Sequence, residues 1–513
     1  MPAMCRRRLP PCPWRAAARP HRPGAKVASL AAVLLIGCIA ALPGSAQTAA
    51  PPAALPPDAA AALQRAHVPP EALSLLLQEV GNGRTLLALR AETPVNPASL
   101  FKLLTTYAAL DLLGPAWTWS TPVWIQGTLR NGVLDGAVIV KGTGDPKLVL
   151  ERVWLLLERV QQLGVREIHG DIVLDRSAFA TVDGTVADFD GEPTRPYNVR
   201  PDALLLNFKS VSYGFVPDAA RGIAVVTAEP RLAEAPADRQ VPLTAGPCDD
   251  WRGALKANFT DPGSVRFAGS YPASCGVQAW PVADVDPASY NARLIAALWR
   301  QMGGVLTGSV HEGKSPTATA PSFELRSPPL AEVVRDINKF SNNVMAQQLF
   351  LSLALARAPG QPATPEAARE TLRLWVQERL GAEAGDGLVI DNGSGLSRDS
   401  RLTARFLARL LQQAWAGPLM PELLSSLPVA GVDGTVRKLK GATGRAHLKT
   451  GSLRDVVGVA GYVLSDSGRR YVLVAIVNHP NANAARPAID AVVQWVARDA
   501  PLTRPTPPEK TPR

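Results

Sequence analysis

Residues 97–115 read PASLFKLLTTYAALDLLGP, and this stretch predicts a helix that begins with two chemically useful side chains. The amphipathic run extends from Ser99 to Leu113 and ends at Gly114. Ser99 and Lys102 are three residues apart, so they lie one turn apart on the same helix face. The helix N-terminus favours negative charge, such as an alkoxide forming at the serine. Burial or a neighbouring cation lowers a lysine pKa, and only the neutral amine can accept the serine proton.

A second candidate element is Lys449-Thr450-Gly451, at the end of a predicted strand and followed by Ser452. A lysine at a sheet edge can bind a carboxylate or lower the pKa of another lysine nearby. Gly451 leaves room for a substrate backbone, and the amide after it can face an oxyanion. Taken alone, the three residues are more typical of an ordinary turn at a strand end than of a functional site.

A third element interrupts the strongly helical stretch of residues 330–355. Ser341-Asn342-Asn343 places three polar residues inside it, which is costly unless they serve a purpose when buried. A second S-x-N pattern starts at Ser289, where we expect a polar loop with no comparable setting. We therefore prefer the copy at Ser341 as a candidate site.

Together and in this order, the three elements resemble the S-x-x-K, S-x-N and K-T-G set of the penicillin-recognising serine enzymes. Ser341 lies 242 residues after Ser99, far more than a β-lactamase needs. That gap resembles the large insertion of the class C, low-molecular-mass penicillin-binding proteins, the D-alanyl-D-alanine carboxypeptidase/endopeptidases. The resemblance covers about residues 58–500. One departure is Gln347-Gln348, because the family pattern has an acid at the first of these positions. Four further stretches look like the same family: 142–146, 195–198, 391–398 and 431–435.

The resemblance implies hydrolysis through an acyl-enzyme. Ser99 is the expected nucleophile toward the carbonyl of the penultimate D-Ala, and Lys102 is expected to take its proton. Ser341 is expected to pass a proton to the departing amine, and Asn343 to hydrogen-bond the substrate amide. Peptidoglycan peptides are the implied substrates and β-lactam antibiotics the implied covalent inhibitors. No metal and no organic cofactor is implied.

The resemblance also implies the substrate contacts. Lys449 is expected to hold the terminal carboxylate, with Thr450 and Gly451 beside the substrate. The backbone amides of the nucleophile and of Ser452 are expected to form the oxyanion hole. Asp175, in the insertion, is expected to meet a free amine of the stem peptide, although an aspartate at a strand end is usually a turn cap.

The predicted fold class is α+β, with the penicillin-recognising serine enzyme fold: an antiparallel sheet with helices on both faces. The catalytic domain is predicted to be discontinuous, formed by residues 58–117 and 321–500. Residues 118–320 contain many short alternating segments separated by Gly, Pro and Asp. This pattern indicates a β-rich insertion, as two nested domains.

Local patterns predict the elements of the catalytic domain. Gly81-Asn82-Gly83 is a hairpin signal between two apolar strands. Further segments are predicted as three strands and a closing helix: 445–449, 456–464, 471–478 and 484–497.

The N-terminus predicts export. Residues 1–46 have a basic start, an apolar run of sixteen residues and then small residues, which is typical of a cleaved secretory signal and too short for a membrane span. Cys38 lies in a lipoprotein-like box, so a lipid anchor there is the alternative. Residues 47–57 are predicted as a linker and 501–513 as a disordered tail. We therefore expect a periplasmic protein.

Cys248 and Cys275 are the two cysteines that remain after the signal. An oxidising compartment favours a disulfide between them, which would stabilise the fold by roughly 3 kcal/mol. Two free buried thiols are the alternative.

Composition excludes several classes of protein. The 513-residue chain has a formal charge of +10, but the signal and the tail hold nearly all of the excess. The nearly neutral body therefore offers no basic groove for nucleic acid. A hydrophobic content of 46% with 19% charged residues excludes both a disordered chain and a polytopic membrane protein. The sequence gives no indication of the oligomeric state.

Other catalytic motifs are absent or unsuited. Residues 308–315 match a phosphate-binding loop, but Pro316 prevents the helix that such a loop needs. The chain has no G-x-S-x-G and no H-E-x-x-H, and His447 is expected to lie on a strand face rather than act as a base. A β-lactamase and a non-catalytic wall-binding protein are the alternative functions. Stable penicillin labelling and product formation distinguish them.

Overall fold

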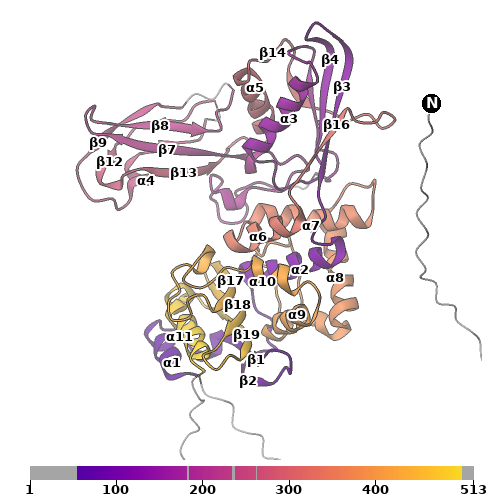
Figure 1. The fold of residues 1–513 in the computed structure, drawn as a ribbon. Helices are drawn as coiled ribbons and strands as arrows, with labels where there is room; N and C mark the ends of the chain where they lie inside the picture. The colour runs from indigo at the N-terminus through magenta and orange to yellow at the C-terminus, as the bar shows by residue number, and fades with distance from the viewer. Residues whose placement is uncertain (1–54, 182–183, 234–236, 262, 500–513) are drawn as a thin grey trace, which may run out of the picture. The chain divides into compact units, whose positions relative to one another are not determined.

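The computed structural model describes residues 55–499 except for 182–183, 234–236 and 262 (Figure 1). Four predicted features lie outside the described residues: the signal at 1–46, Cys38, most of the linker and the tail at 501–513. Within the described part of the chain, no helix is both long and apolar enough to cross a membrane.

The two ends of the described chain build one antiparallel sheet with the order β17-β18-β19-β1-β2. Its strands are β1 (Leu73–Glu79), β2 (Thr85–Leu89), β17 (Ala446–Leu453), β18 (Val456–Leu464) and β19 (Arg470–Asn478). The predicted hairpin and C-terminal strands are confirmed. The strand prediction was wrong in one detail: β17 does not end at Lys449-Thr450-Gly451 but continues through it, because its pairing with β18 extends to Leu453.

Helices cover both faces of this sheet, as predicted (Figure 1). They are α1 (Pro57–Arg65) and α11 (Arg486–Ala497) on one face, and α2 (Lys102–Leu113) and α9 (Ala404–Ala416) on the other. Side chains alternate between the faces along a strand. Leu75 therefore belongs to the core with α1 and α11, whereas Leu76 belongs to the core with α2 and α9.

The remaining helices of this part share one core with α2, which is buried from Lys102 to Leu110. They are α6 (Leu330–Phe340), α7 (Asn343–Arg357), α8 (Pro365–Leu380) and α10 (Met420–Ser426). The helical stretch predicted at 330–355 is therefore two helices. The chain breaks at Ser341, which has a left-handed φ of 56°.

The second sheet contains β3 and β4, a long antiparallel hairpin, with β5 and β6 parallel to β4. Its seven strands are β3 (Ser120–Arg130), β4 (Val133–Lys141), β5 (Glu167–His169), β6 (Ile172–Asp175), β14 (Val305–Leu306), β15 (Val310–Glu312) and β16 (Phe323–Arg326). Helices α3 (Leu150–Gln162) and α5 (Tyr290–Gln301) share its core. Because β16 pairs with β3, this sheet extends past residue 320.

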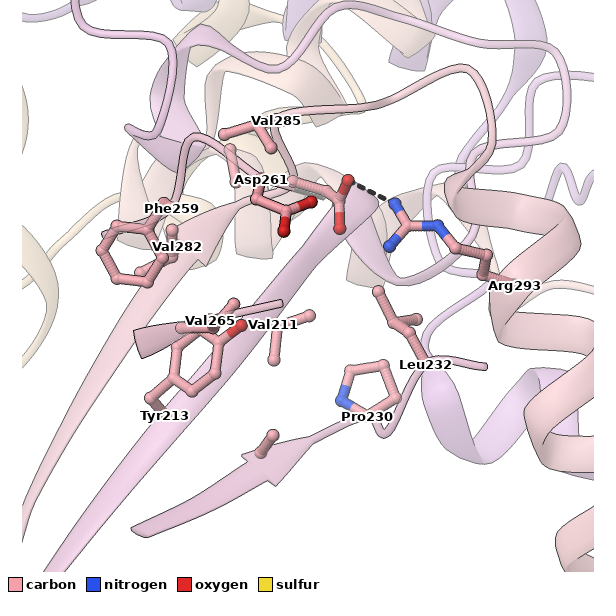
Figure 2. Close-up of a pocket in the computed structure, with 13 residues that line it drawn as sticks. Val211, Tyr213, Pro230, Leu232, Phe259, Asp261, Val265, Val282, Val285 and Arg293 are labelled. Atoms are coloured by element: carbon pink, nitrogen blue, oxygen red, sulfur yellow. Dashed lines mark hydrogen bonds and ion pairs between the residues drawn. The ribbon is translucent and has the colours of Figure 1, made fainter. Parts of the chain in front are cut away.

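The third sheet has the order β12-β9-β8-β7-β13. Its strands are β7 (Ser210–Asp218), β8 (Ile223–Glu229), β9 (Gln240–Thr244), β12 (Tyr271–Pro272) and β13 (Gln278–Ala283); α4 (Trp251–Ala254), β10 (Ala257–Asn258) and β11 (Arg266–Phe267) lie nearby in sequence. Cys248 and Cys275 are joined by a disulfide here. Figure 2 shows a small pocket on this sheet, bordered by Tyr213, Phe259 and Arg293. The guanidinium of Arg293 pairs with the carboxylate of Asp284 at 2.6 Å.

The second S-x-N pattern was wrongly predicted to lie in a polar loop. Ser289 precedes α5, and Tyr290 and Asn291 are buried in its first turn. Burial is possible because the Tyr290 hydroxyl donates to the Ser210 carbonyl (2.9 Å) and the Asn291 amide to that of Leu204 (2.7 Å). The phosphate-loop match at 308–315 contains β15 and, as expected, no helix.

Candidate active site

Ser99 lies on a 3-10 turn, η2 (Ala98–Phe101), and the α-helix begins only at Lys102. The prediction of a regular helix from Ser99 was therefore wrong at its first turn. Ala98 has a left-handed φ of 47°, and its N–H donates to the Asn96 side chain at 2.9 Å. This local hydrogen bond competes with regular helix formation and tightens the turn.

Two glycines allow the chain to close around this turn. A Cβ atom at Gly395 would lie 1.9 Å from the carbonyl oxygen of Ala98, and one at Gly451 would lie 2.7 Å from that of Pro97. Neither position can therefore carry a side chain without moving the backbone. The serine turn is held between β17 and the 391–398 segment, which limits its freedom to move.

The Lys102 amine is fully buried, and each of its donors has a partner. Nζ lies 2.9 Å from Ser99 Oγ, 2.6 Å from Asn343 Oδ1 and 2.6 Å from the Ser394 carbonyl oxygen. Burial, and secondly the charge of Lys449, lower the pKa of Lys102 well below its usual 10.5. All three partners can accept hydrogen bonds and none is a carboxylate, so no counter-ion in direct contact opposes this shift.

Ser341 and Lys449 form the opposite side of the site. Ser341 occupies the left-handed turn between α6 and α7, and its Oγ accepts a hydrogen bond from Lys449 Nζ at 2.8 Å. The same amine donates to the Thr450 carbonyl at 2.7 Å. Burial lowers the pKa of Lys449 from 10.5 to about 7. The structure therefore places two buried lysines with depressed pKa values beside two serine hydroxyls.

The outer edge of β17 is available to an extended ligand. The Leu448 N–H donates to the Pro428 carbonyl at 2.9 Å across this edge. After Leu448, no backbone group of the described residues pairs with this edge of β17. Successive N–H groups alternate between the two edges of a strand. The N–H groups of Thr450 and Ser452 therefore point to the same open edge. This is the orientation that an oxyanion hole at Ser452 requires.

The other predicted residues have contacts of their own. Asn343 Nδ2 donates to the Tyr197 carbonyl at 3.2 Å, so the inserted region reaches this site. The Ser452 hydroxyl is exposed and accepts from Arg486 at 2.7 Å. His447 lies on β17, where its ring contacts the Leu424 carbonyl at 3.3 Å.

Asp175 ends β6 and is almost fully buried. It accepts the N–H groups of Ser177 (2.9 Å) and Ser315 (2.8 Å). Burial raises its pKa, but these hydrogen bonds outweigh that effect and lower it overall. The contacts are those of a turn cap, and binding of a substrate amine by Asp175 stays a prediction.

Sequence reasoning missed several residues that shape the site. Thr435 accepts the Thr450 hydroxyl at 2.7 Å, and the Ser394 carbonyl holds the Lys102 amine. The carboxylate of Asp433 pairs at 2.6 Å with the buried amine of Lys339, and Lys339 lies two residues before Ser341. The segments 391–398 and 431–435 resembled the family, but the pattern alone did not assign them these contacts.

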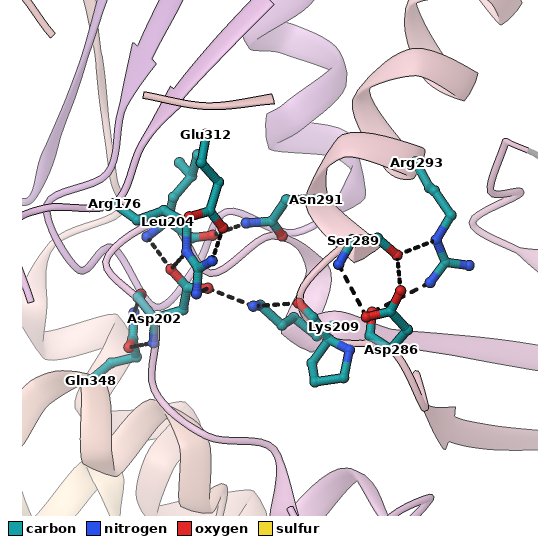
Figure 3. A network of polar contacts seen from close by, with 11 residues as sticks. Arg176, Asp202, Leu204, Lys209, Asp286, Ser289, Asn291, Arg293, Glu312 and Gln348 are labelled. Carbon is teal, nitrogen blue, oxygen red and sulfur yellow. Dashed lines mark hydrogen bonds and ion pairs between the residues drawn. The ribbon is translucent and has the colours of Figure 1, made fainter. Parts of the chain in front are cut away.

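Gln348, the second residue of the Gln347-Gln348 pair, belongs to a buried polar network (Figure 3). Gln348 is buried on α7 and contacts Asp202 twice, accepting its N–H at 2.9 Å and donating to its carbonyl at 2.8 Å. The Asp202 carboxylate pairs with Arg176 and Lys209. Burial raises the pKa of Asp202, but these cations lower it overall. The network connects the helix of Asn343 to the inserted region.

Among the described residues, no cluster of His, Cys, Asp and Glu is arranged to hold a metal ion.

Comparison with known proteins identifies the family. The model of the D-Ala-D-Ala carboxypeptidase 3 (S13) family matches residues 58–499. The chain belongs to this family. It is thus a serine-type D-alanyl-D-alanine carboxypeptidase, a peptidase of the hydrolase class. A D-alanyl-D-alanine carboxypeptidase from Actinomadura sp. is 30% identical over 433 residues, 79% of this chain and 77% of that protein.

Two further matches, one of sequence and one of structure, are to a protein named DacB in Haemophilus influenzae. The D-alanyl-D-alanine carboxypeptidase DacB of this organism is 26% identical over 400 residues, 74% of this chain and 80% of that protein. The crystal structure of its penicillin binding protein 4 matches with a TM-score of 0.68 at 22% identity, covering 85% of this chain and 99% of that one. At this identity the likeness concerns the fold, and it supports the predicted penicillin-recognising serine enzyme fold.

Proposed function

We propose that this chain cleaves D-Ala-D-Ala termini and D-Ala cross-links of peptidoglycan stem peptides through an acyl-enzyme at Ser99, and that penicillins inhibit it covalently. The observation that carries this proposal is the buried Lys102 amine, 2.9 Å from Ser99 Oγ and with a strongly lowered pKa. A neutral amine at this distance can accept the serine proton without help from histidine.

Acylation follows from the positions of these groups. Ser99 Oγ attacks the carbonyl carbon of the penultimate D-Ala while its proton passes to Lys102 Nζ. The N–H groups of Ser99 and Ser452 stabilise the negative charge on the carbonyl oxygen, and losing one such donor costs roughly 3–4 kcal/mol of barrier.

The leaving group departs on the Lys449 side. The carbon–nitrogen bond breaks, and the departing amine receives through the Ser341 hydroxyl the proton that Lys102 took from Ser99; Ser341 keeps its hydrogen bond to Lys449 and ends with its own proton restored. The protonated form of Lys449 attracts the terminal carboxylate, and the Thr450 hydroxyl can turn from Thr435 to meet it. Asn343 orients both Lys102 and the substrate amide. Water then attacks the ester carbonyl, the neutral Lys102 amine takes the proton of this water, and the carbon–oxygen bond to Ser99 breaks as Ser99 Oγ takes that proton back.

A fluorescent penicillin tests the nucleophile. The native protein should be labelled on the peptide that contains Ser99, as read by mass spectrometry, and Ser99→Ala should not be labelled. Ser425→Ala removes an exposed hydroxyl elsewhere and should be labelled like the native protein. Lys102→Ala should be labelled slower by orders of magnitude. Normal labelling of Ser99→Ala would reject the mechanism.

We further propose that the protein is exported to the periplasm with cleavage after the signal of residues 1–46. The peptidoglycan substrate and the disulfide of Cys248 with Cys275 both suit that compartment. The mass of the mature N-terminus, measured on protein from membrane and soluble fractions, distinguishes cleavage from lipidation at Cys38.

A further inference from the structure

A second pocket adjoins the strand that carries Lys449. It has a volume of about 340 Å³ and lies between the 434–439 segment, strands β17 and β18, and helix α11. Thr450 lines the pocket together with Val457 and Val459 of β18. Thr450 pairs with Val459, and Ser452 with Val457, so the four side chains share one face of the sheet. The polar residues of its lining are Thr435, Arg437, Lys438, Thr450, Arg486 and Asp490.

The charge of this pocket is predominantly positive. Arg437, Lys438 and Arg486 line it, and no described carboxylate lies within ion-pair distance of any of the three. Arg486 is held in place by hydrogen bonds to Ser452 Oγ (2.7 Å) and Asn483 Oδ1 (3.2 Å). Asp490 is the single acid in the lining, and burial raises its pKa while the charge of Arg486 acts in the opposite direction. The pocket therefore favours an anion.

The pocket lies on the α11 face of the sheet, opposite to the serine turn, and reaches the leaving-group side of the scissile bond only at the edge of β17, through Thr450. Strand residues rise about 3.4 Å each, so Thr450 lies roughly 7 Å along β17 from the oxyanion amide of Ser452. That is about the span from a reacting carbonyl to the carboxylate of the following residue. The Thr450 hydroxyl donates a hydrogen bond to the hydroxyl of Thr435, which lines the pocket. A leaving residue bound by Lys449 and Thr450 therefore has this pocket within reach of its side chain.

We propose that this pocket binds a second carboxylate, carried by the side chain of the leaving D-amino acid. The inference rests on the proposed function, because it uses the same acyl-enzyme and the same departing amine. It adds no covalent step: the pocket attracts the side chain while the peptide bond breaks. The protein then accepts leaving groups more acidic than D-Ala, namely D-amino acids whose side chain carries a carboxylate in addition to the terminal one.

Two leaving groups of nearly equal shape test the proposal. N-acyl-D-Ala-D-Glu and N-acyl-D-Ala-D-Gln differ in one side-chain charge, and both keep the terminal carboxylate. At low ionic strength we expect the native kcat/KM for the D-Glu peptide to exceed that for the D-Gln peptide roughly three- to tenfold, as suits exposed cations. The ratio should fall to about one in the Arg437→Gln/Lys438→Gln double variant, and also at about 0.5 M salt, because exposed charges are screened.

Lys440→Gln provides the matched control. Lys440 is exposed on the same segment but does not line the pocket, so its variant should keep the native ratio. A native ratio of one or less, a ratio unchanged in the double variant, or an equal loss in Lys440→Gln would overturn the proposal. N-acyl-D-Ala-D-Ala is measured in parallel. If this peptide is hydrolysed but the D-Glu to D-Gln ratio is one, only the proposal of an anion-binding pocket is rejected. If no peptide is hydrolysed and penicillin does not label the protein, the proposed function itself is rejected.

Discussion

Replacing Lys449 by methionine should stabilise the protein at neutral pH while removing a group that the proposed reaction needs. Lys449 is fully buried, and burial lowers its pKa from 10.5 to about 7. Each pKa unit is worth about 1.4 kcal/mol, so burying this amine opposes folding by roughly 4–5 kcal/mol below pH 7. The variant also loses the hydrogen bonds to Ser341 and Thr450, about 1 kcal/mol each. The net gain is about 2–3 kcal/mol at pH 7.

The sign of the effect depends on pH. The folded protein binds this proton less tightly than the unfolded chain, so the native protein gains stability as the pH rises from about 7 toward 10.5. The advantage of Lys449→Met should therefore be largest at pH 7 or below and shrink by more than half at pH 9. Differential scanning calorimetry measures it as a rise in Tm of several degrees at pH 7.

Lys440→Met is the control, because it removes an exposed lysine from a neighbouring turn and should leave Tm unchanged at both pH values. A Tm of Lys449→Met that is lower than native at pH 7, or a difference that does not vary between pH 7 and 9, would refute the argument from burial.

Three further predictions follow from the same contacts. Gly451→Ala should slow penicillin acylation at least tenfold in a stopped-flow assay, because the added Cβ meets the Pro97 carbonyl at 2.7 Å; unchanged acylation would show that the turn can move freely. The kcat/KM for peptides with a free carboxylate should fall as the pH rises above about 7, where Lys449 loses its charge, whereas C-terminally amidated peptides should show no such fall. An equal fall for both peptides would remove Lys449 from carboxylate binding. Cys275→Ser should destabilise the inserted region by roughly 2–5 kcal/mol in urea unfolding, with penicillin labelling retained under native conditions; loss of labelling would show that the disulfide shapes the active site.

The sheet and the residues of the three motifs could be predicted because their signals are local. An apolar strand, a polar triplet inside a helix and a serine one turn from a lysine are each visible within a few residues. The combination then pointed to one fold, and the structure brings Ser99, Lys102, Ser341 and Lys449 together from segments far apart in the sequence.

The contacts that complete the site could not be predicted in this way. Ser394 contributes a backbone carbonyl and Asn96 caps a strained turn, and neither role has a side-chain pattern of its own. The error at Ser289 has a similar cause, since the partners that allow Tyr290 and Asn291 to be buried come from about 80 residues earlier in the chain.

A titration of the lysine side chains tests the central claim most directly. The chain has only twelve lysines, so [ε-13C]lysine labelling gives few NMR signals, and Lys102→Ala and Lys449→Met assign the two of interest. We predict that the Lys102 signal titrates far below 10.5 and that of Lys449 near pH 7. A Lys102 signal that titrates in the ordinary range would leave Ser99 without a base and contradict the mechanism.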